Sequence, residues 1–226
     1  YPTFITCGSY WGVGKWMKSA EIVTIHEFAH QYFQGMLASN EFEESFLDEG
    51  FTQYFEGKIM DHYYPNGSQA NFLGAHLNDF ASSKSGFFAM DNIRVSPIVQ
   101  KAWLYPDQSY GTLSYYKTAI SLKTLEGLIG EKKMNAAFKE YFEKYKFKHP
   151  TFSDFVACVN NQGVNVDEFI KQAFFQTNVC DYEIKTIINA ERKAKPSGYF
   201  TVNRLGDFVI ASKIKVIFDD NKYQII

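Results

Sequence analysis

The hydrophobic residues of this chain change their spacing near Cys180, and this change limits the folds that are open to it. Before that point, apolar residues recur every three to four positions, which is the period of an amphipathic helix. After it, segments such as KIKVIF alternate apolar and polar residues, as strands with one buried face do. The pattern therefore predicts a mainly helical domain followed by antiparallel sheet.

Turn-forming residues divide the helical part into segments. Helices are predicted over 20–37, 43–63, 68–82, 111–129, 131–147, 151–160 and 167–176, with loop over most of 86–109. Ser19 is the expected N-cap of the first helix, and Gly130 is the expected end of the fourth. Thr151 and Asp154 form a capping-box pattern. The segment 196–198, Pro-Ser-Gly, is expected to be a turn between strands.

The first predicted helix contains an H-E-x-x-H pattern, from His26 through Glu27 to His30. Residues four apart lie on one face of a helix, about 6 Å apart along its axis, so both imidazoles can reach one metal ion. A catalytic zinc ion takes three protein ligands, with zinc–nitrogen bonds of about 2.0–2.1 Å. Two histidines at this spacing can also be ordinary core residues, and a third ligand is needed to distinguish the two cases.

Glu49 is the candidate third ligand, nineteen residues after His30. About eight residues would carry the first helix onward from His30, and about eight residues of the next helix would return the same distance, roughly 12 Å. An antiparallel helix pair would therefore place Glu49 level with His30. Taken alone, a glutamate at this position would more often be an exposed helix residue.

The sequence around these residues resembles the gluzincin metallopeptidases of the aminopeptidase-N type, which include leukotriene-hydrolase-like enzymes. The segments VTIHEFAHQYFQGM and SFLDEGFTQYFEG are similar to the family's V-x-H-E-x-x-H-Q-W-F-G and W-L-N-E-G-F-A-x-Y-x-E. The resemblance continues through YYKTAISLKTLEGLIGEKKMNAAFKEYFEKYKFKHPTFSDF. It implies a mainly α, thermolysin-like catalytic domain over 1–180, truncated at its N-terminus. Residues 181–226 would then be the start of an antiparallel β-sandwich domain.

The resemblance implies a zinc-dependent aminopeptidase with one zinc ion per chain and peptides with a free N-terminus as substrates. His26, His30 and Glu49 match the family's zinc ligands, and Glu27 matches its general base. Zinc lowers the pKa of a water ligand, and a carboxylate beside it can accept the proton that this water loses. Glu56, seven residues after Glu49, matches a family glutamate that would hold one ligand histidine through its second ring nitrogen.

Tyr115 matches the family tyrosine that stabilises the oxyanion formed during peptide hydrolysis. The Y-x-K spacing to Lys117 selects Tyr115 rather than its neighbour Tyr116. The family has glycine after that lysine, whereas this chain has Thr118. The other histidines, at 62, 76 and 149, have no metal-ligand spacing and are expected to be structural or on the surface.

The family holds the substrate's free amine with a glutamate in a G-x-M-E-N motif upstream of the zinc helix. This chain reads Tyr1-Pro2-Thr3-Phe4 at its start, which would align just after that glutamate. We therefore expect a fragment that lacks the upstream domain of the same polypeptide and that, by itself, is weakly active or inactive.

Two other functions stay open on the sequence alone. One is an epoxide hydrolase or endopeptidase on the same scaffold, and the other is a catalytically silent scaffold or binding module. The net charge of −2 gives no electrostatic reason to expect nucleic acid as a partner. The sequence contains no run of about 18 or more apolar residues, the length that would suggest a membrane-spanning helix. The three widely spaced cysteines fit a reducing compartment, but the sequence does not decide between cytoplasm and periplasm.

Overall fold

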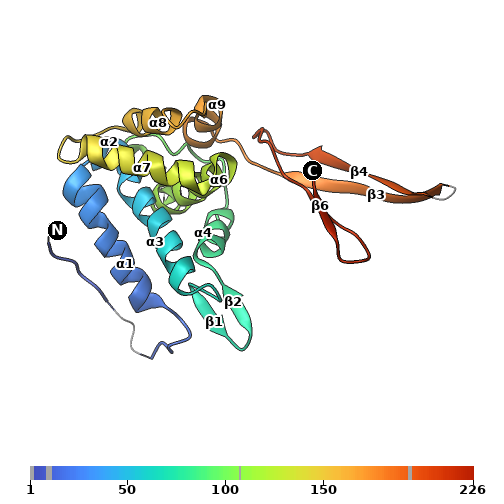
Figure 1. Cartoon of the computed structure of the whole chain (residues 1–226). Coiled ribbons are helices and arrows are strands. Elements are labelled where there is room, and N and C mark those ends of the chain that lie inside the picture. The colour runs from blue at the N-terminus through green and yellow to red at the C-terminus, as the bar shows by residue number, and fades with distance from the viewer. Residues whose placement is uncertain (1–2, 9–11, 107, 193–194) are drawn as a thin grey trace. The chain divides into compact units, whose positions relative to one another are not determined.

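The computed structural model describes residues 3–8, 12–106, 108–192 and 195–226. Tyr1 and Pro2, on which the alignment with the G-x-M-E-N segment rests, lie outside these residues. The chain forms two compact units, Tyr1–Thr177 and Asn178–Ile226, and each is described by itself (Figure 1). Among the described residues, no helix has the length and apolar character needed to cross a membrane.

The first unit is built around two helices, α1 (Ser19–Tyr32) and α3 (Glu49–Tyr63), which pack side by side (Figure 1). They run antiparallel, since His26 contacts Glu56 in the middle of α3 and the later His30 contacts Glu49 at its start. The N-cap of α1 is Lys18, so the prediction of Ser19 is wrong by one residue. Lys18 makes no side-chain cap, and its backbone N–H donates to the Gln69 carbonyl.

The connection from α1 to α3 is folded along its length rather than being a simple turn. α1 continues into a π-helical turn, η1 (Phe33–Leu37). A short helix, α2 (Glu41–Glu44), follows, and the Asn40 side chain caps it by accepting from the Phe42 N–H. A 3-10 turn, η2 (Ser45–Leu47), then leads into α3.

Aromatic rings form the core against which α3 packs. Phe51 is fully buried, and its ring centroid lies 5.4 Å from that of Phe138 and 4.8 Å from that of Phe155. These two rings come from α7 (Glu131–Tyr145) and α8 (Phe152–Asn160). Aromatic pairs of this kind contribute about 0.5–1.5 kcal/mol each beyond the area that they bury. The core thus fixes the first turns of α3, where the candidate ligand Glu49 lies.

The remaining helical elements of the first unit follow the predicted segments only in part: those from Thr112 onward fall within predicted helices, whereas one lies in the predicted loop 86–109. They are α4 (Asp79–Phe88), η3 (Ala102–Leu104), α5 (Ser109–Gly111), η4 (Thr112–Lys117), α6 (Thr118–Ile129), α9 (Asp167–Ile170) and η5 (Lys171–Phe175). Gly130 ends α6 with φ 90°, and the capping box of Thr151 and Asp154 is present at α8, so both predictions are confirmed.

Residues 68–82, predicted to be one helix, form a β-hairpin and the start of α4 instead. Strand β1 (Ala70–Phe72) pairs antiparallel with β2 (Ala75–Leu77). Gly67 and Gly74 adopt φ values of 107° and 84° on either side of β1. Such conformations are accessible to glycine and interrupt a helix, so the helical spacing of the apolar residues here was misleading.

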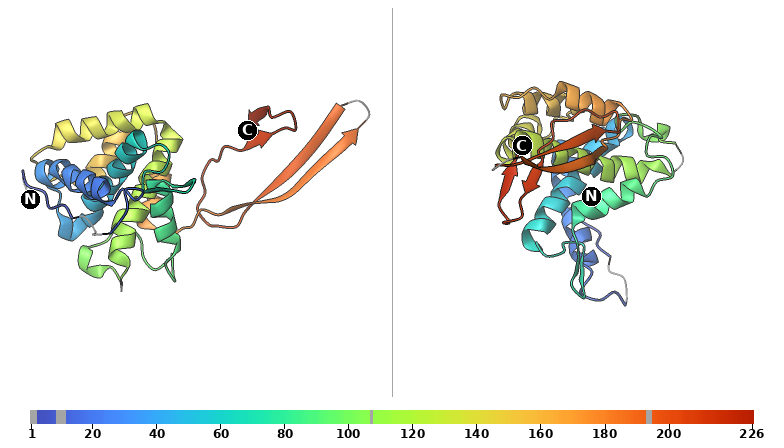
Figure 2. Two further views of the ribbon diagram at one scale, coloured as in Figure 1. Left: turned by 90° about the horizontal axis from the view of Figure 1, so that it is seen from below. Right: turned by 90° about the vertical axis from the view of Figure 1, so that its right-hand side faces the viewer.

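The second unit consists of two antiparallel hairpins (Figures 1 and 2). Strand β3 (Tyr182–Arg192) pairs with β4 (Lys195–Arg204), and β5 (Lys215–Ile217) pairs with β6 (Tyr223–Ile225). The segment 196–198, predicted to be a turn, lies inside β4. The chain is mainly helical with small antiparallel sheets, as its spacing predicted. The thermolysin-like domain over 1–180 and the β-sandwich domain from 181 stay predictions.

Gly50 allows α3 to begin in direct contact with the segment that joins η4 to α6. A Cβ on Gly50 would collide with the Thr118 side chain and the Ser114 carbonyl oxygen. We expect Gly50→Ala to lower the free energy of unfolding by about 1–3 kcal/mol, the usual cost of overpacking. Urea denaturation monitored by circular dichroism would measure the change.

The matched control is Gly127→Ala in the exposed last turn of α6, where a Cβ would meet nothing within 4 Å. This change should leave stability unchanged or raise it by up to about 1 kcal/mol, because alanine is the better helix former. Equal urea midpoints for Gly50→Ala and the unaltered chain would show that α3 does not lie in such close contact with η4.

Candidate active site

Helices α1 and α3 bring three ligand-type side chains together. His26 and His30 lie one turn apart on α1, and Glu49 is the first residue of α3. Glu49 Oε2 lies 3.5 Å from His26 Nε2 and 3.3 Å from His30 Nε2. The potential ligand atoms of the three side chains all lie within 4.8 Å of one another, and they form the one such group found among the described residues.

Glu49 reaches this position by a route that differs from the predicted one. The sequence argument assumed about eight residues of a returning helix before Glu49. In the structure, α3 begins at Glu49, and the preceding residues form α2 and η2. Phe46 and Leu47 in η2 are almost completely buried, and this burial fixes the turn from which Glu49 projects. Glu49 therefore lies next to His30 as expected, but a compact connection between α1 and α3 brings it there.

The three side chains fit a tetrahedral metal ion. Glu49 Oε2 is buried and has no hydrogen-bond partner, although it faces the Nε2 atoms of both histidines. In a tetrahedral zinc site with bonds of about 2.0–2.1 Å, neighbouring ligand atoms lie about 3.3–3.4 Å apart. The observed separations of 3.3 and 3.5 Å match this spacing. The donor set of two imidazoles and one carboxylate is also one that zinc accepts in catalytic sites.

A buried carboxylate holds each imidazole through its other ring nitrogen. His26 Nδ1 lies 2.7 Å from Glu56 Oε2, and His30 Nδ1 lies 2.6 Å from Asp48 Oδ1. Such a partner fixes the ring orientation and leaves Nε2 for a metal. Glu56 was singled out from the sequence, whereas Asp48 was missed. Its position directly before Glu49, where the quoted family motif has asparagine, was the available signal.

These carboxylates favour the charged form of both imidazoles. Burial lowers the pKa of His26, but the nearby carboxylates of Glu49 and Glu56 outweigh burial and raise it from 6.5 to about 9. Burial is likewise outweighed by Asp48 and Glu49 at His30, whose pKa rises to about 10. Burial would raise the pKa of Glu49, yet the two histidines lower it from 4.5 to about 2. The three groups therefore form a strongly coupled electrostatic unit.

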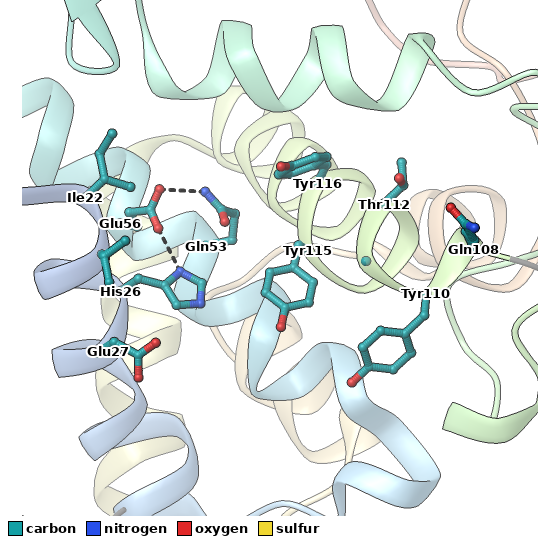
Figure 3. A pocket seen from close by; sticks show the side chains of 12 residues that line it. Ile22, His26, Glu27, Gln53, Glu56, Gln108, Tyr110, Thr112, Tyr115 and Tyr116 are labelled. Carbon is teal, nitrogen blue, oxygen red and sulfur yellow. Dashed lines mark hydrogen bonds and ion pairs between the residues drawn. The ribbon is translucent and has the colours of Figure 1, made fainter. Parts of the chain in front are cut away.

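A pocket of about 580 Å³ opens beside His26 (Figure 3). Glu27 lines it from α1, and Tyr115 lines it from η4. The predicted base and the predicted oxyanion donor thus border one space, together with one of the candidate ligands. A substrate in this pocket would lie within reach of all three side chains.

Tyr115 lies in the π-helical turn η4, and its ring stacks on that of His26, with centroids 5.8 Å apart and planes at 7°. Burial and the Glu49 carboxylate raise the pKa of Tyr115, so the phenol keeps its proton. Tyr116 also lines the pocket, but its ring packs against Gly86, where a Cβ would lie 2.7 Å away. The geometry therefore brings Tyr115 toward the candidate ligands and turns Tyr116 toward α4.

Two further observations concern residues outside the predicted set. Tyr110, which the sequence analysis did not single out, lines the pocket, and its ring centroid lies 6.5 Å from that of Tyr115. The remaining histidines lie elsewhere: His62 packs on Tyr63, His76 is exposed in β2, and His149 Nδ1 lies 2.8 Å from a backbone carbonyl oxygen.

Comparison with known proteins identifies relatives of this site and fold. The family model described as "Peptidase family M1 domain" matches residues 13–173. "Probable aminopeptidase 2" of Sulfurisphaera tokodaii is 26% identical over 159 residues, which are 69% of this chain and 20% of that protein. "Leucine aminopeptidase 2" of Phaeosphaeria nodorum is 24% identical over 162 residues, 71% of this chain and 25% of that protein.

A solved structure shares the fold. A variant of an M1 zinc metallopeptidase from Deinococcus radiodurans superposes with a TM-score of 0.54 and 17% identity, over 68% of this chain and 33% of that one. The chain thus spans a third or less of the length of these proteins.

We expect the binding of one zinc ion near pH 7 to release about two protons. His26 and His30, with pKa values raised to about 9 and about 10, carry protons at that pH, and zinc requires both Nε2 atoms to be neutral. The apparent affinity should therefore rise with pH, by roughly 100-fold per unit between about pH 6 and 8, and level off as the pH passes the raised pKa values. Calorimetry in two buffers of different ionisation enthalpy would count the protons. Zinc binding without proton release would contradict the charged state of the imidazoles.

Proposed function

This chain belongs to peptidase family M1, and we propose that it carries the catalytic centre of a zinc aminopeptidase. The observation that carries the proposal is the buried Oε2 atom of Glu49, which lacks a hydrogen-bond partner and faces the Nε2 atoms of His26 and His30. A buried anionic oxygen is costly unless a cation compensates it, and a zinc ion would take the place of the protons that the two imidazoles carry without it. We assign the three side chains as the protein ligands of one zinc ion per chain.

In the proposed mechanism, zinc supplies a Lewis acid that acidifies water and polarises the scissile carbonyl group. Glu27 lines the pocket beside the ligands and is assigned as the general base. Its carboxylate accepts a proton from the water that attacks the N-terminal peptide bond, and it later returns that proton to the departing amine. Glu56 and Asp48 keep the two imidazoles oriented, with Nδ1 donating to each carboxylate.

Tyr115 is assigned as the donor to the oxyanion that develops on the scissile carbonyl. A phenol can serve this purpose only while it is protonated, and the raised pKa of Tyr115 is in keeping with that requirement. The stacking of its ring on His26 fixes the direction of the hydroxyl group before the substrate arrives. Preorganised donors of this kind are among the largest contributors to catalysis.

Peptides with a free N-terminus are the proposed substrates, in keeping with the names of the curated relatives. We also propose that residues 1–180 form the thermolysin-like catalytic domain and that 181–226 belong to a β-sandwich. The expectation that the 226 residues alone cleave slowly stays a prediction. It would be tested by comparing their kcat/KM with that of a longer form containing a G-x-M-E-N segment.

Replacing a ligand should remove the metal without unfolding the helices. We expect His30→Ala and Glu49→Ala each to weaken zinc binding by several orders of magnitude, because two protein ligands hold the ion far less tightly than three. Competition with a chromophoric chelator would measure the affinity, and circular dichroism would verify the helical content. His76→Ala, in the exposed strand β2, is the matched control and should bind zinc as the unaltered chain does. Full zinc affinity in Glu49→Ala would exclude Glu49 as a ligand.

The base and the tyrosine should affect the rate but not the metal. In a longer form that contains the upstream segment, we expect Glu27→Gln to retain zinc and to lose nearly all turnover of aminoacyl nitroanilides. Tyr115→Phe should retain zinc and lose on the order of 10²–10³ in kcat, the scale for one oxyanion donor. Tyr116→Phe is the control and should keep a rate close to that of the unaltered chain. If Tyr115→Phe were fully active and Tyr116→Phe were not, the two assignments would have to be exchanged.

A further inference from the structure

Glu56 is itself held by a buried amide. Its Oε2 atom accepts from His26 Nδ1 at 2.7 Å, and its other oxygen, Oε1, accepts from Gln53 Nε2 at 2.8 Å (Figure 3). The same Gln53 nitrogen lies 3.4 Å from Asp79 Oδ1. One amide group, with two N–H bonds, therefore bridges two buried carboxyl groups. The proposed chemistry uses neither Gln53 nor Asp79.

Asp79 has a fixed position because its other polar atoms are also engaged. It is the first residue of α4 and is fully buried. Its Oδ2 atom accepts from Gln69 Nε2, and its backbone N–H donates to Ser68 Oγ, both at 2.7 Å. Gly57 brings α3 close to it, since a Cβ there would lie 3.0 Å from Asp79 Oδ1 and 2.8 Å from the Phe80 ring.

We propose that Asp79 is a positioning residue for the metal centre, acting on His26 through Gln53 and Glu56. Asp79 fixes the amide of Gln53, the amide fixes the carboxylate of Glu56, and the carboxylate fixes the ring of His26. The inference rests on the proposed assignment of His26 as a zinc ligand. It adds two residues, Gln53 on α3 and Asp79 on α4, that are connected to His26 through Glu56.

The charge of the cluster is compatible with this arrangement. Two buried carboxyl groups that share one amide would repel each other if both were ionised. Burial, followed by the charge of Glu56, raises the pKa of Asp79 from 3.8 to about 8. The Asp79 carboxyl therefore mostly keeps its proton near neutral pH. A neutral side chain of the same shape should consequently be able to replace it.

Zinc affinity of the purified chain, measured by chelator competition, tests the proposal. Gln53→Met removes the bridging amide with little change in shape, and Asp79→Ala removes the anchor behind it. Each should weaken zinc binding by about tenfold, at the lower end of the range for partners of metal ligands. Asp79→Asn keeps an acceptor oxygen without a charge and should stay within about threefold of the unaltered chain.

The control is Glu126→Gln, which alters another buried carboxylate that contacts α3. Glu126 accepts from Tyr54 and Lys58 of α3, and it belongs neither to the candidate ligand set nor to the hydrogen-bond chain from Asp79 to His26. This variant should lose stability, measured by urea denaturation, and keep its zinc affinity. A general loosening of α3 would instead reduce the zinc affinity of the control and of Asp79→Ala alike, and that result would overturn the proposal.

A double-mutant cycle separates the hydrogen-bond chain from other effects. If Asp79 acts through Glu56, Asp79→Ala should weaken zinc binding less than about twofold further in a Glu56→Gln background. A full tenfold effect in that background would overturn the proposal, as would unchanged affinity in both Gln53→Met and Asp79→Ala. If Asp79→Ala fails to fold, Gln53→Met and Asp79→Asn decide the matter. A failure of the unaltered chain to bind zinc would overturn the proposed function as well, so the two failures are distinguishable.

Discussion

The antiparallel contact between α1 and α3 is the constraint on which the candidate centre depends. A histidine side chain rotates about two bonds, so a helix that carries two of them does not set their ring directions by itself. Here each ring is fixed by a carboxylate from the other side of the helix pair, Glu56 for His26 and Asp48 for His30. The ring of Phe33, directly after α1, packs on that of Phe51 in α3 with centroids 5.8 Å apart, and this contact holds the two helices together. The packing of apolar side chains between the helices thus determines the geometry of the contacts between the histidines and the carboxylates.

The opposite wall of the pocket depends on a π-helical turn and on one glycine. η4 is a π-helical turn, and such turns often occur at functional sites because the additional residue rotates the side chains that follow. Tyr115 is thereby stacked on His26, while its neighbour Tyr116 packs against Gly86. Gly50 allows this wall to approach the start of α3 directly. The position of the proposed oxyanion donor relative to α3 is therefore set by a glycine and a wide turn.

The sequence predicted those features that depend on periodicity or on a short motif. Four such features are present in the structure. They are the helical part of the chain, the antiparallel strands after Cys180, the end of α6 at Gly130 and the closeness of Glu49 to His30. The helix predicted over 68–82 was wrong, because two glycines with positive φ allow a hairpin that apolar spacing does not reveal. Asp48, Gln53 and Asp79 were missed because a buried polar residue is recognisable only by its partners, which are distant in sequence.

The folded connection between α1 and α3 has a consequence for how such centres can be recognised in other chains. The number of residues between His30 and Glu49, eighteen here, does not by itself fix their separation. The elements η1, α2 and η2 form a compact connection between them. Buried residues anchor this connection at both ends, Phe33 and Leu37 at the first and Phe46 and Leu47 at the second. Lengthening such a loop carries only a small, logarithmic entropic penalty. A homologue could therefore insert residues near α2 and retain the three-dimensional arrangement of its ligands. A search that demands a fixed interval between the histidines and the glutamate would overlook it.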